Sequence, residues 1–252
     1  MPNPFIRKLE SFANLPVDVV DRLKAATNAP KSFDAKTDLI REGDRTGPVF
    51  IVLEGWACRY KILPNGSRQI IAFLIPGDAC DLHTELVEVM DHSIQTITPC
   101  KIAVISREDM RGLLEKSPQF AKAMYIAQLV DEGTMRAWIV SMGRRTSIER
   151  VAHLVCELYL RFRQIGRADD SALALPLSQI ILADALGMTP VHINRILKEL
   201  RLAGAMDLQR GSLIIADPLK LVRIAGFDEN YLHRRLLAEG KDRWEFGGPA
   251  DL

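Results

Sequence analysis

The stretch from Ser178 to Ala203, SQIILADALGMTPVHINRILKELRLA, constrains the fold of this chain more strongly than any other segment. Its pattern predicts two short helices joined by a tight turn. Ser178 can cap the first helix, because its hydroxyl accepts a hydrogen bond from a backbone N–H that has no helical partner. Gly187 suits the positive φ at which helices often end. Thr189 and Pro190 suit the cap and the first position of the second helix.

The spacing of small and branched residues predicts that these two helices cross closely. Ala183 lies where the two helices nearly touch, and Gly187 lies where the chain reverses. Ile193 supplies an aliphatic side chain that packs between the helices. This spacing is typical of a helix-turn-helix, whose second helix enters the major groove of DNA. An ordinary packed helical hairpin is the alternative interpretation. On the first interpretation, the residues that contact DNA are Ser178, Gln179, Thr189, Pro190, His192, Asn194, Arg195 and Lys198.

The balance of charge gives no independent support for nucleic-acid binding. The chain has 33 Lys and Arg against 32 Asp and Glu, and the residues from Thr146 onward have 14 of each kind. DNA-binding domains are often strongly basic, so phosphate contacts here would depend on backbone amides and on locally placed cations such as Arg195, Lys198, Arg201 and Arg210. Lys198 is placed for such a contact. Arg195 can pair with both acceptors of a guanine, and we expect it to be the main base reader.

Length and composition exclude several other classes of protein. The 252 residues are enough for two domains with a good core. No segment approaches the roughly 18 consecutive apolar residues of a membrane span, so we expect a cytoplasmic protein with no membrane partner. No Ser/His/Asp order, paired-carboxylate motif or phosphate-binding glycine loop occurs, so an enzyme is not expected. Four cysteines without CxxC pairing are expected to be reduced core thiols: Cys58, Cys80, Cys100 and Cys156.

Residues 31–105 consist of short apolar runs separated by turn residues, after one or two short helices in residues 3–29. Pro64-Asn65-Gly66 is a strong hairpin turn, because Asn and Gly tolerate positive φ. Short strands at regular spacing with such turns predict a small antiparallel barrel or jelly roll. The apolar runs place strands at Leu39–Ile40, Val49–Leu53, Ala57–Leu63, Gln69–Ile75, Ser93–Ile97 and Ile102–Ile105.

A long helix is predicted from Pro118 to about Met142, followed by a hinge at Gly143-Arg144-Arg145. Its apolar residues spread too widely around the helix to pack on one face of one barrel. We therefore expect the helix to pack against a second copy of the chain as well. An interior helix of a monomer is the alternative. The expected interface residues are Phe120, Met124, Ala127, Val130, Met135 and Trp138.

A small β-hairpin, or wing, is predicted beyond the helix-turn-helix. Ala205–Leu208 and Ser212–Ala216 flank the turn residues Gln209-Arg210-Gly211. Arg210 would lie at the tip of this wing and is a further candidate for contact with DNA. Residues 233–252 mix charges with glycines and are expected to form a flexible tail.

Short motifs in a fixed order make the chain similar to a known family. They are Glu42-Gly43-Asp44, Leu53-Glu54-Gly55, Pro76-Gly77-Asp78, Leu186–Thr189 and Asn194–Lys198. Together they resemble the CRP/FNR family of bacterial transcription regulators. The resemblance implies an α+β chain that acts as a homodimer on palindromic promoter sites, with RNA polymerase as a further partner. Its implied parts are a cyclic-nucleotide-binding-type β-barrel (jelly roll) in 1–117, a dimerisation helix and hinge in 118–145, a winged helix-turn-helix in 146–232 and the tail in 233–252.

The sequence departs from the family where some members bind cyclic AMP. After Pro-Gly-Asp those members carry Gly-Glu-Leu, and an Arg-Ser pair follows; the glutamate accepts from the ribose hydroxyl and the arginine pairs with the cyclic phosphate. Leu82 and His92 stand at the glutamate and arginine positions here. Leu82 accepts no hydrogen bond and His92 is only a part-time cation, so the effector is expected not to be cyclic AMP. The expected effector pocket comprises Cys80, Asp81, Leu82, His83, His92 and Ser93.

The second helix of the helix-turn-helix also differs from the common pattern of this family, in which a Glu and an Arg stand four residues apart. Here Val191 replaces the Glu, while Arg195 retains the Arg. The operator half-site should therefore differ from the common one.

No cofactor is identified from the sequence, and the chain lacks the amino-terminal cysteine cluster of the iron–sulfur members.

Two alternatives to this interpretation remain, one for the function and one for the chemistry of the barrel. A sensor protein that uses its helix-turn-helix for protein contact is the alternative function. A zinc, iron or haem site is the alternative chemistry, although buried thiols, a hydrogen-bonded histidine and a solvated glutamate explain the same residues. Its candidate ligands are Cys80, His83, Glu85, His92 and Cys100.

Overall fold

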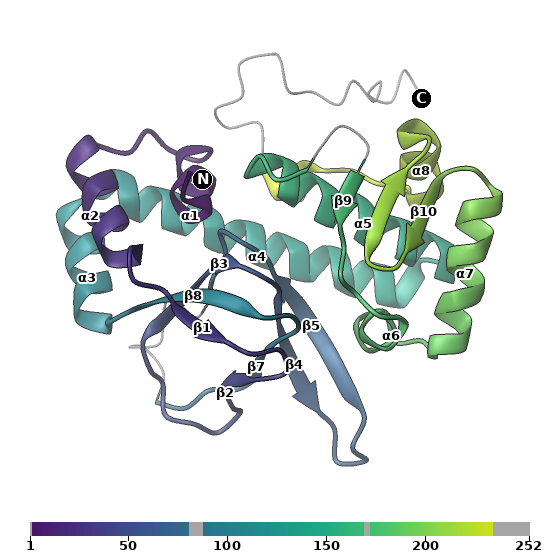
Figure 1. Ribbon diagram of the computed structural model, residues 1–252, viewed down its shortest axis with the longest axis horizontal. Coiled ribbons are helices and arrows are strands. Elements are labelled where there is room, and N and C mark those ends of the chain that lie inside the picture. Colours follow the sequence, from purple (N-terminus) through teal and green to yellow (C-terminus); the bar gives the residue numbers. More distant parts are fainter. Residues whose placement is uncertain (1, 81–87, 169–171, 234–252) are drawn as a thin grey trace.

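The computed structural model describes residues 2–80, 88–168 and 172–233. It contains an N-terminal barrel of strands, one long helix that runs along the molecule, and a C-terminal helical domain with a small sheet (Figure 1). The α+β class and the order of these parts are as the sequence predicts. Within the described ranges, no single helix is both long and apolar enough to span a membrane.

The barrel consists of two four-stranded antiparallel sheets. One sheet has the order β1 (Lys31–Phe33), β8 (Cys100–Ile105), β3 (Val49–Glu54) and β6 (Ala79–Cys80). The other has the order β2 (Asp38–Ile40), β7 (Ser93–Thr96), β4 (Ala57–Ile62) and β5 (Arg68–Leu74). The sequence predicts β2, β3, β4, β5, β7 and β8 and misses β1 and β6, because neither of these two contains a run of large apolar residues.

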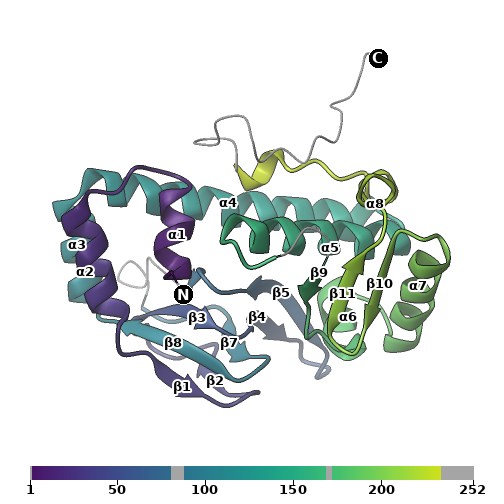
Figure 2. The same cartoon turned by 45° about the horizontal axis from the view of Figure 1, so that its top comes forward.

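The helices α1 (Pro4–Glu10), α2 (Val17–Thr27) and α3 (Arg107–Lys116) gather at one end of the long helix α4 (Pro118–Arg144) (Figures 1 and 2). α4 ends at Arg144, two residues beyond the predicted end at Met142, and the backbone of Arg145 that follows is extended. The next helix, α5 (Ser147–Gln164), starts where the Glu149 carboxylate accepts from the N–H of Thr146 over 2.7 Å. The break between the two helices therefore falls at Arg145-Thr146, just beyond Gly143.

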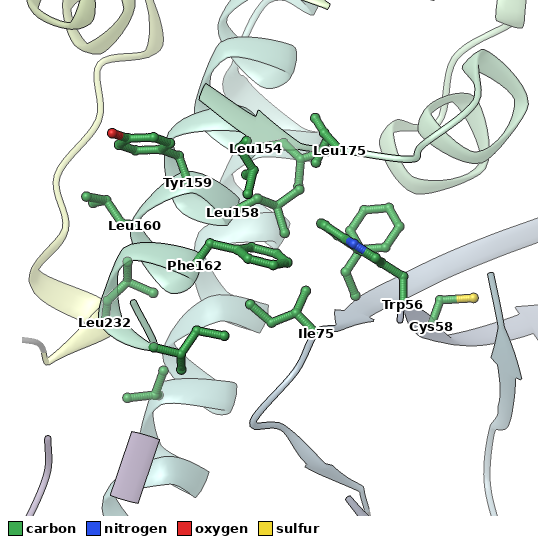
Figure 3. Close-up of a cluster of buried hydrophobic side chains, with 14 of the residues drawn as sticks. Trp56, Cys58, Ile75, Leu154, Leu158, Tyr159, Leu160, Phe162, Leu175 and Leu232 are labelled. Atoms are coloured by element: carbon green, nitrogen blue, oxygen red, sulfur yellow. The ribbon is translucent and has the colours of Figure 1, made fainter. Parts of the chain in front are cut away.

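One hydrophobic core runs without interruption from the barrel into the C-terminal domain. Trp56 of the β3–β4 turn stacks on Phe162 of α5, with 5.0 Å between the ring centroids, and Ile75 and Leu158 lie close to them (Figure 3). The predicted parts 1–117 and 146–232 thus share a core, and α5 anchors the C-terminal domain to the barrel.

Buried charges connect the same parts of the chain. Asp78, from the Pro-Gly-Asp motif, lies 2.7 Å from Nζ of Lys8 and 2.6 Å from a guanidinium nitrogen of Arg161. Burial opposes the charge of Asp78, but Lys8 and Arg161 outweigh this effect and lower the pKa of the carboxyl. The three ionised groups join α1, the turn before β6 and α5.

Most of the predicted interface residues of α4 face the interior of their own chain. Phe120, Met124, Ala127 and Val130 are buried, in a helix that contacts α1, α3, α5 and the short 3-10 helix η1 (Asn230–Leu232). Trp138 is partly buried and packs against the core. The prediction is corrected for the four buried residues, because elements of the same chain cover them, whereas Trp138 is only partly covered. Met135 is 47% exposed.

Candidate nucleic-acid interface and effector cavity

The helices α6 (Gln179–Leu186) and α7 (Pro190–Leu202) form the predicted helix-turn-helix, with a bend of 100° between them. Ser178 caps α6 by accepting from the N–H of Ile181 (3.3 Å), and Thr189 caps α7 by accepting from the N–H of His192 (3.2 Å). Gly187 has the expected positive φ of 62°. The bend lies within the range of helix-turn-helix motifs.

The outer face of α7 is open to solvent. Val191 is 82% exposed, and Asn194, Arg195 and Lys198 are exposed beside it. The opposite side of the helix is buried against the domain, and α7 lies at the edge of the molecule in both views (Figures 1 and 2). The buried residues of α7 are Ile193, Ile196, Leu197 and Leu200.

Arg195 is braced by its neighbour one turn earlier. Its guanidinium donates to Nδ1 of His192 over 2.8 Å, which requires the neutral imidazole with its proton on Nε2. The bond orients the exposed guanidinium along the helix surface. The two side chains together present N–H donors, the groups that pair with the N7 and O6 acceptors of guanine in the major groove.

The other cations near α7 differ in what they can contact. Lys198 is exposed, one turn beyond Arg195. Arg201 is engaged within the domain, because its Nε donates over 2.5 Å to Asp207. Lys198 is therefore better placed than Arg201 for the phosphate backbone, while Arg201 ties α7 to the wing.

The predicted wing is formed by β10 (Met206–Gln209) and β11 (Ser212–Ile215). Its two turn residues, Arg210 and Gly211, both have positive φ, which is characteristic of the tight type I′ hairpin turn. Arg210 is exposed at the tip. The sequence misses β9 (Ala172–Ala174), which pairs with β11 and makes the sheet three-stranded.

The remaining predicted contacts lie at the starts of the two helices. Ser178 and Gln179 are exposed at the start of α6, and Thr189 and Pro190 are exposed at the start of α7. The hydroxyls of Ser178 and Thr189 accept the capping bonds and can still donate to a phosphate oxygen.

A second surface feature is an apolar stripe along α4. Leu129, Glu132, Arg136 and Ile139 follow one another at intervals of three, four and three residues. This is the spacing of contact positions in coiled coils. Glu132 and Arg136 form an ion pair of 3.5 Å within it. Exposed apolar residues gathered on one face mark an interaction site. The α4 stripe consists of Tyr125, Leu129, Met135, Ile139 and Val140.

A cavity of about 310 Å³ lies between the barrel and the middle of α4, at the lower end of the range of small-molecule sites. Of the predicted pocket residues, His92 lines it, Cys80 and Ser93 are buried within the barrel, and Asp81, Leu82 and His83 lie outside the described residues. The other lining residues could not be predicted from the sequence, because they come together only when α4 packs on β5. These are Arg59, Ile71, Ala72, Phe73, Leu74, Ala79, Asp91, Gln128, Asp131, Thr134, Met135 and Arg161.

Charges that line the cavity stand close to opposite charges. Arg59 lies 3.5 Å from Asp131, and Arg161 is paired with Asp78. His92 Nδ1 lies 2.7 Å from Asp91, and this hydrogen bond lowers the pKa of the Asp91 carboxyl. Among the described lining residues, each charged group named here therefore has an opposite charge beside it.

The candidate metal ligands are not brought together in the part of the chain that the structure describes. No group of three or more His, Cys, Asp or Glu suited to a metal ion occurs among the described residues. Cys100 is buried, and its Sγ donates to the carbonyl of Trp56. His83 and Glu85 lie outside the described ranges.

Two families of known proteins match this chain, one in the barrel and one in the C-terminal domain. The family described as "Cyclic nucleotide-binding domain" matches residues 30–117, and the family "Crp-like helix-turn-helix domain" matches residues 149–224. The nitrogen fixation regulation protein FixK of Bradyrhizobium diazoefficiens is 28% identical over 77% of this chain and 80% of its own length. The transcriptional activator protein anr of Pseudomonas aeruginosa is 24% identical over 84% of this chain and 87% of its own length.

A solved structure shares the fold. FixK2 from Bradyrhizobium japonicum aligns with a TM-score of 0.71 at 22% identity, covering 79% of this chain and 98% of that one.

Proposed function

The chain belongs to the CRP/FNR family of transcription regulators, and from this premise we propose that it binds palindromic promoter sites as a homodimer whose effector is not cyclic AMP. The observation that carries this proposal is the open outer face of α7. Arg195, Asn194 and Lys198 lie on one exposed side of a helix whose caps and crossing angle suit the major groove. The role is regulatory and not catalytic.

The α4 stripe supports the homodimer. Two copies of the stripe related by a two-fold axis would bury each other's apolar residues, as in coiled-coil dimers. The same two-fold axis would place two copies of α7 on successive major grooves, which explains why the target should be palindromic.

The proposed partners are therefore double-stranded DNA and a second copy of the chain, with RNA polymerase as the third on family grounds. Since these partners act where bacterial DNA lies, we place the protein in the cytoplasm.

A mobility-shift experiment tests DNA binding directly. Wild-type protein should shift a subset of genomic fragments in the presence of excess unrelated competitor DNA, with two chains per DNA molecule. The double variant Arg195→Ala/Lys198→Ala should lose these shifts while keeping its fold and its mass in solution. If the two proteins behave alike, the helix-turn-helix does not contact DNA, and the protein-contact alternative gains support.

Cyclic AMP is expected to have no effect on the protein. Two charge-assisted contacts are missing at Leu82 and His92, each worth roughly 1.5–3 kcal/mol, which corresponds to affinity weakened by about two to four orders of magnitude. The paired state of Arg59 and Arg161 in the cavity supports the same expectation. Titration calorimetry should therefore show no binding in the micromolar range. Low-micromolar affinity would contradict the expectation.

A further inference from the structure

The chain continues beyond α8 (Pro218–Ala225) in a segment that returns to the long helix. Residues 226–232, here called the C-terminal strap, lie beyond the match to the helix-turn-helix family, which ends at residue 224. The strap leaves α8 at Gly226, runs back along α5, and packs η1 against α4 (Figure 2). It thereby links the end of the DNA-binding domain to α4, across the break at Arg145-Thr146.

Glu157 of α5 is the point at which the three elements meet. Its side chain is completely buried. Oε2 accepts from the hydroxyl of Tyr231 in the strap over 3.0 Å and from Nε1 of Trp138 in α4 over 3.1 Å. Oε1 lies 3.5 Å from Arg161. A buried carboxylate depends on every such donor, because it has no access to water.

The packing around this carboxylate holds the strap closely. The ring of His153 in α5 lies 4.9 Å from that of Phe227 and 6.0 Å from that of Tyr231, nearly parallel to the latter. Burial, with a smaller effect of Arg145, lowers the pKa of His153 to about 4. The ring is therefore neutral and packs against the two aromatic rings of the strap.

The strap also makes a close backbone contact with α4 at Gly133. A Cβ at this position would lie 3.0 Å from the carbonyl oxygen of Tyr231 and 3.1 Å from its Cβ. A side chain at this position would therefore push the strap back by a few tenths of an ångström.

We propose that the C-terminal strap is a brace that fixes the orientation of the DNA-binding domain on α4, with Tyr231 and Gly133 as positioning residues. The proposal rests on the proposed function, a dimer that binds two half-sites. In such a dimer the two copies of α7 must reach major grooves about one helical turn, or ~34 Å, apart. The braced arrangement leaves the outer face of α7 open, so the strap prepares the domain for DNA and does not cover its binding surface.

A brace differs from a general stabiliser in its effect on half-site spacing. A domain held in place loses less conformational entropy when it binds, which favours the one spacing that fits. Without the brace, binding to the correctly spaced operator weakens, while operators with one base pair added or removed between the half-sites are tolerated better. A loss of folded protein alone would lower binding to all operators by the same factor.

The test compares Tyr231→Phe and Gly133→Ala with two matched controls. Tyr231→Phe keeps the ring and removes the bond to Glu157, and Gly133→Ala adds a methyl group that displaces the strap. Gly112→Ala gains the same helix propensity in α3, where an added Cβ has nothing within 4 Å. A chain that ends after His233 retains the whole strap. Each protein is measured against operators of three spacings. Each is also digested with trypsin, which can cut after Arg145, at the break between α4 and α5.

Both strap variants should bind the best operator about 3- to 10-fold more weakly, Tyr231→Phe because it loses one hydrogen bond and Gly133→Ala because the displaced strap weakens the same contact. Their preference for that spacing should fall, and cleavage at the hinge should accelerate, while both controls match the wild type. Unchanged spacing preference and unchanged cleavage would overturn the proposal, as would equal losses on all three operators. If the wild type binds no DNA, the proposed function fails. The cleavage rates then decide alone whether the strap holds the domain.

Discussion

Leu129→Glu is expected to turn the protein from a dimer into a monomer of 28.2 kDa and to weaken operator binding on the order of a thousandfold. Leu129 belongs to the α4 stripe and is half exposed in the single chain. In a dimer the substitution would bury two carboxylates without partners, at a cost of several kcal/mol for each. A change of about 3 kcal/mol already raises a dissociation constant more than a hundredfold.

The chain offers a matched control in Leu219→Glu. Leu219 of α8 is 52% exposed against 50% for Leu129, so both substitutions should disturb the isolated chain equally little. Light scattering at micromolar concentration should report a dimer for the wild type and for Leu219→Glu, and a monomer for Leu129→Glu. A Leu129→Glu protein that remains dimeric would exclude the α4 stripe as the interface.

Arg195→Ala should lower specific binding and relax the preference at one base pair in each half-site. A bidentate contact with guanine is worth about 1–3 kcal/mol of discrimination, so a dimer would lose about 2–6 kcal/mol. His192→Ala keeps the guanidinium and removes its brace, so its effect should be smaller and of the same kind. Binding titrations on an operator series with each base pair varied measure both effects.

Lys198→Ala should behave differently, although Lys198 lies on the same face of α7 one turn away. A phosphate contact carries affinity without sequence information. The substitution should weaken binding to all sequences alike and reduce the salt slope by about one unit per subunit. If Arg195→Ala lowers affinity and leaves the base preference intact, Arg195 is a phosphate contact, and Asn194 or His192 becomes the better candidate for base reading.

The sequence predicted the helix-turn-helix well because local rules determine it. Ser178, Thr189 and Pro190 act within one turn of their own position, and Gly187 requires only its own φ. The β-strands of six or seven residues were predictable for the same reason, since alternation or an apolar run marks them directly. β9 was missed because its sequence, Ala-Leu-Ala, has a single large apolar residue and so carries no alternation or apolar run.

The burial of α4 could not be predicted, because periodicity shows which residues are apolar and not what covers them. Phe120 and Val130 are as apolar as Leu129 and Ile139 in sequence. Only the packing of α1, α3, α5 and η1 separates the buried set from the α4 stripe. The cavity and the contact of Tyr231 with Glu157 have the same origin, since each joins residues from elements far apart in the chain.

Selection of binding sites from random DNA by the wild-type protein tests the central claim most directly. The open face of α7 and dimerisation through the α4 stripe predict that an inverted repeat is enriched, with half-site centres about 10 base pairs apart. Each half-site should contain a guanine that is no longer enriched when Arg195→Ala is used. Sequences with no common motif, or a single half-site bound by one chain, would contradict the claim.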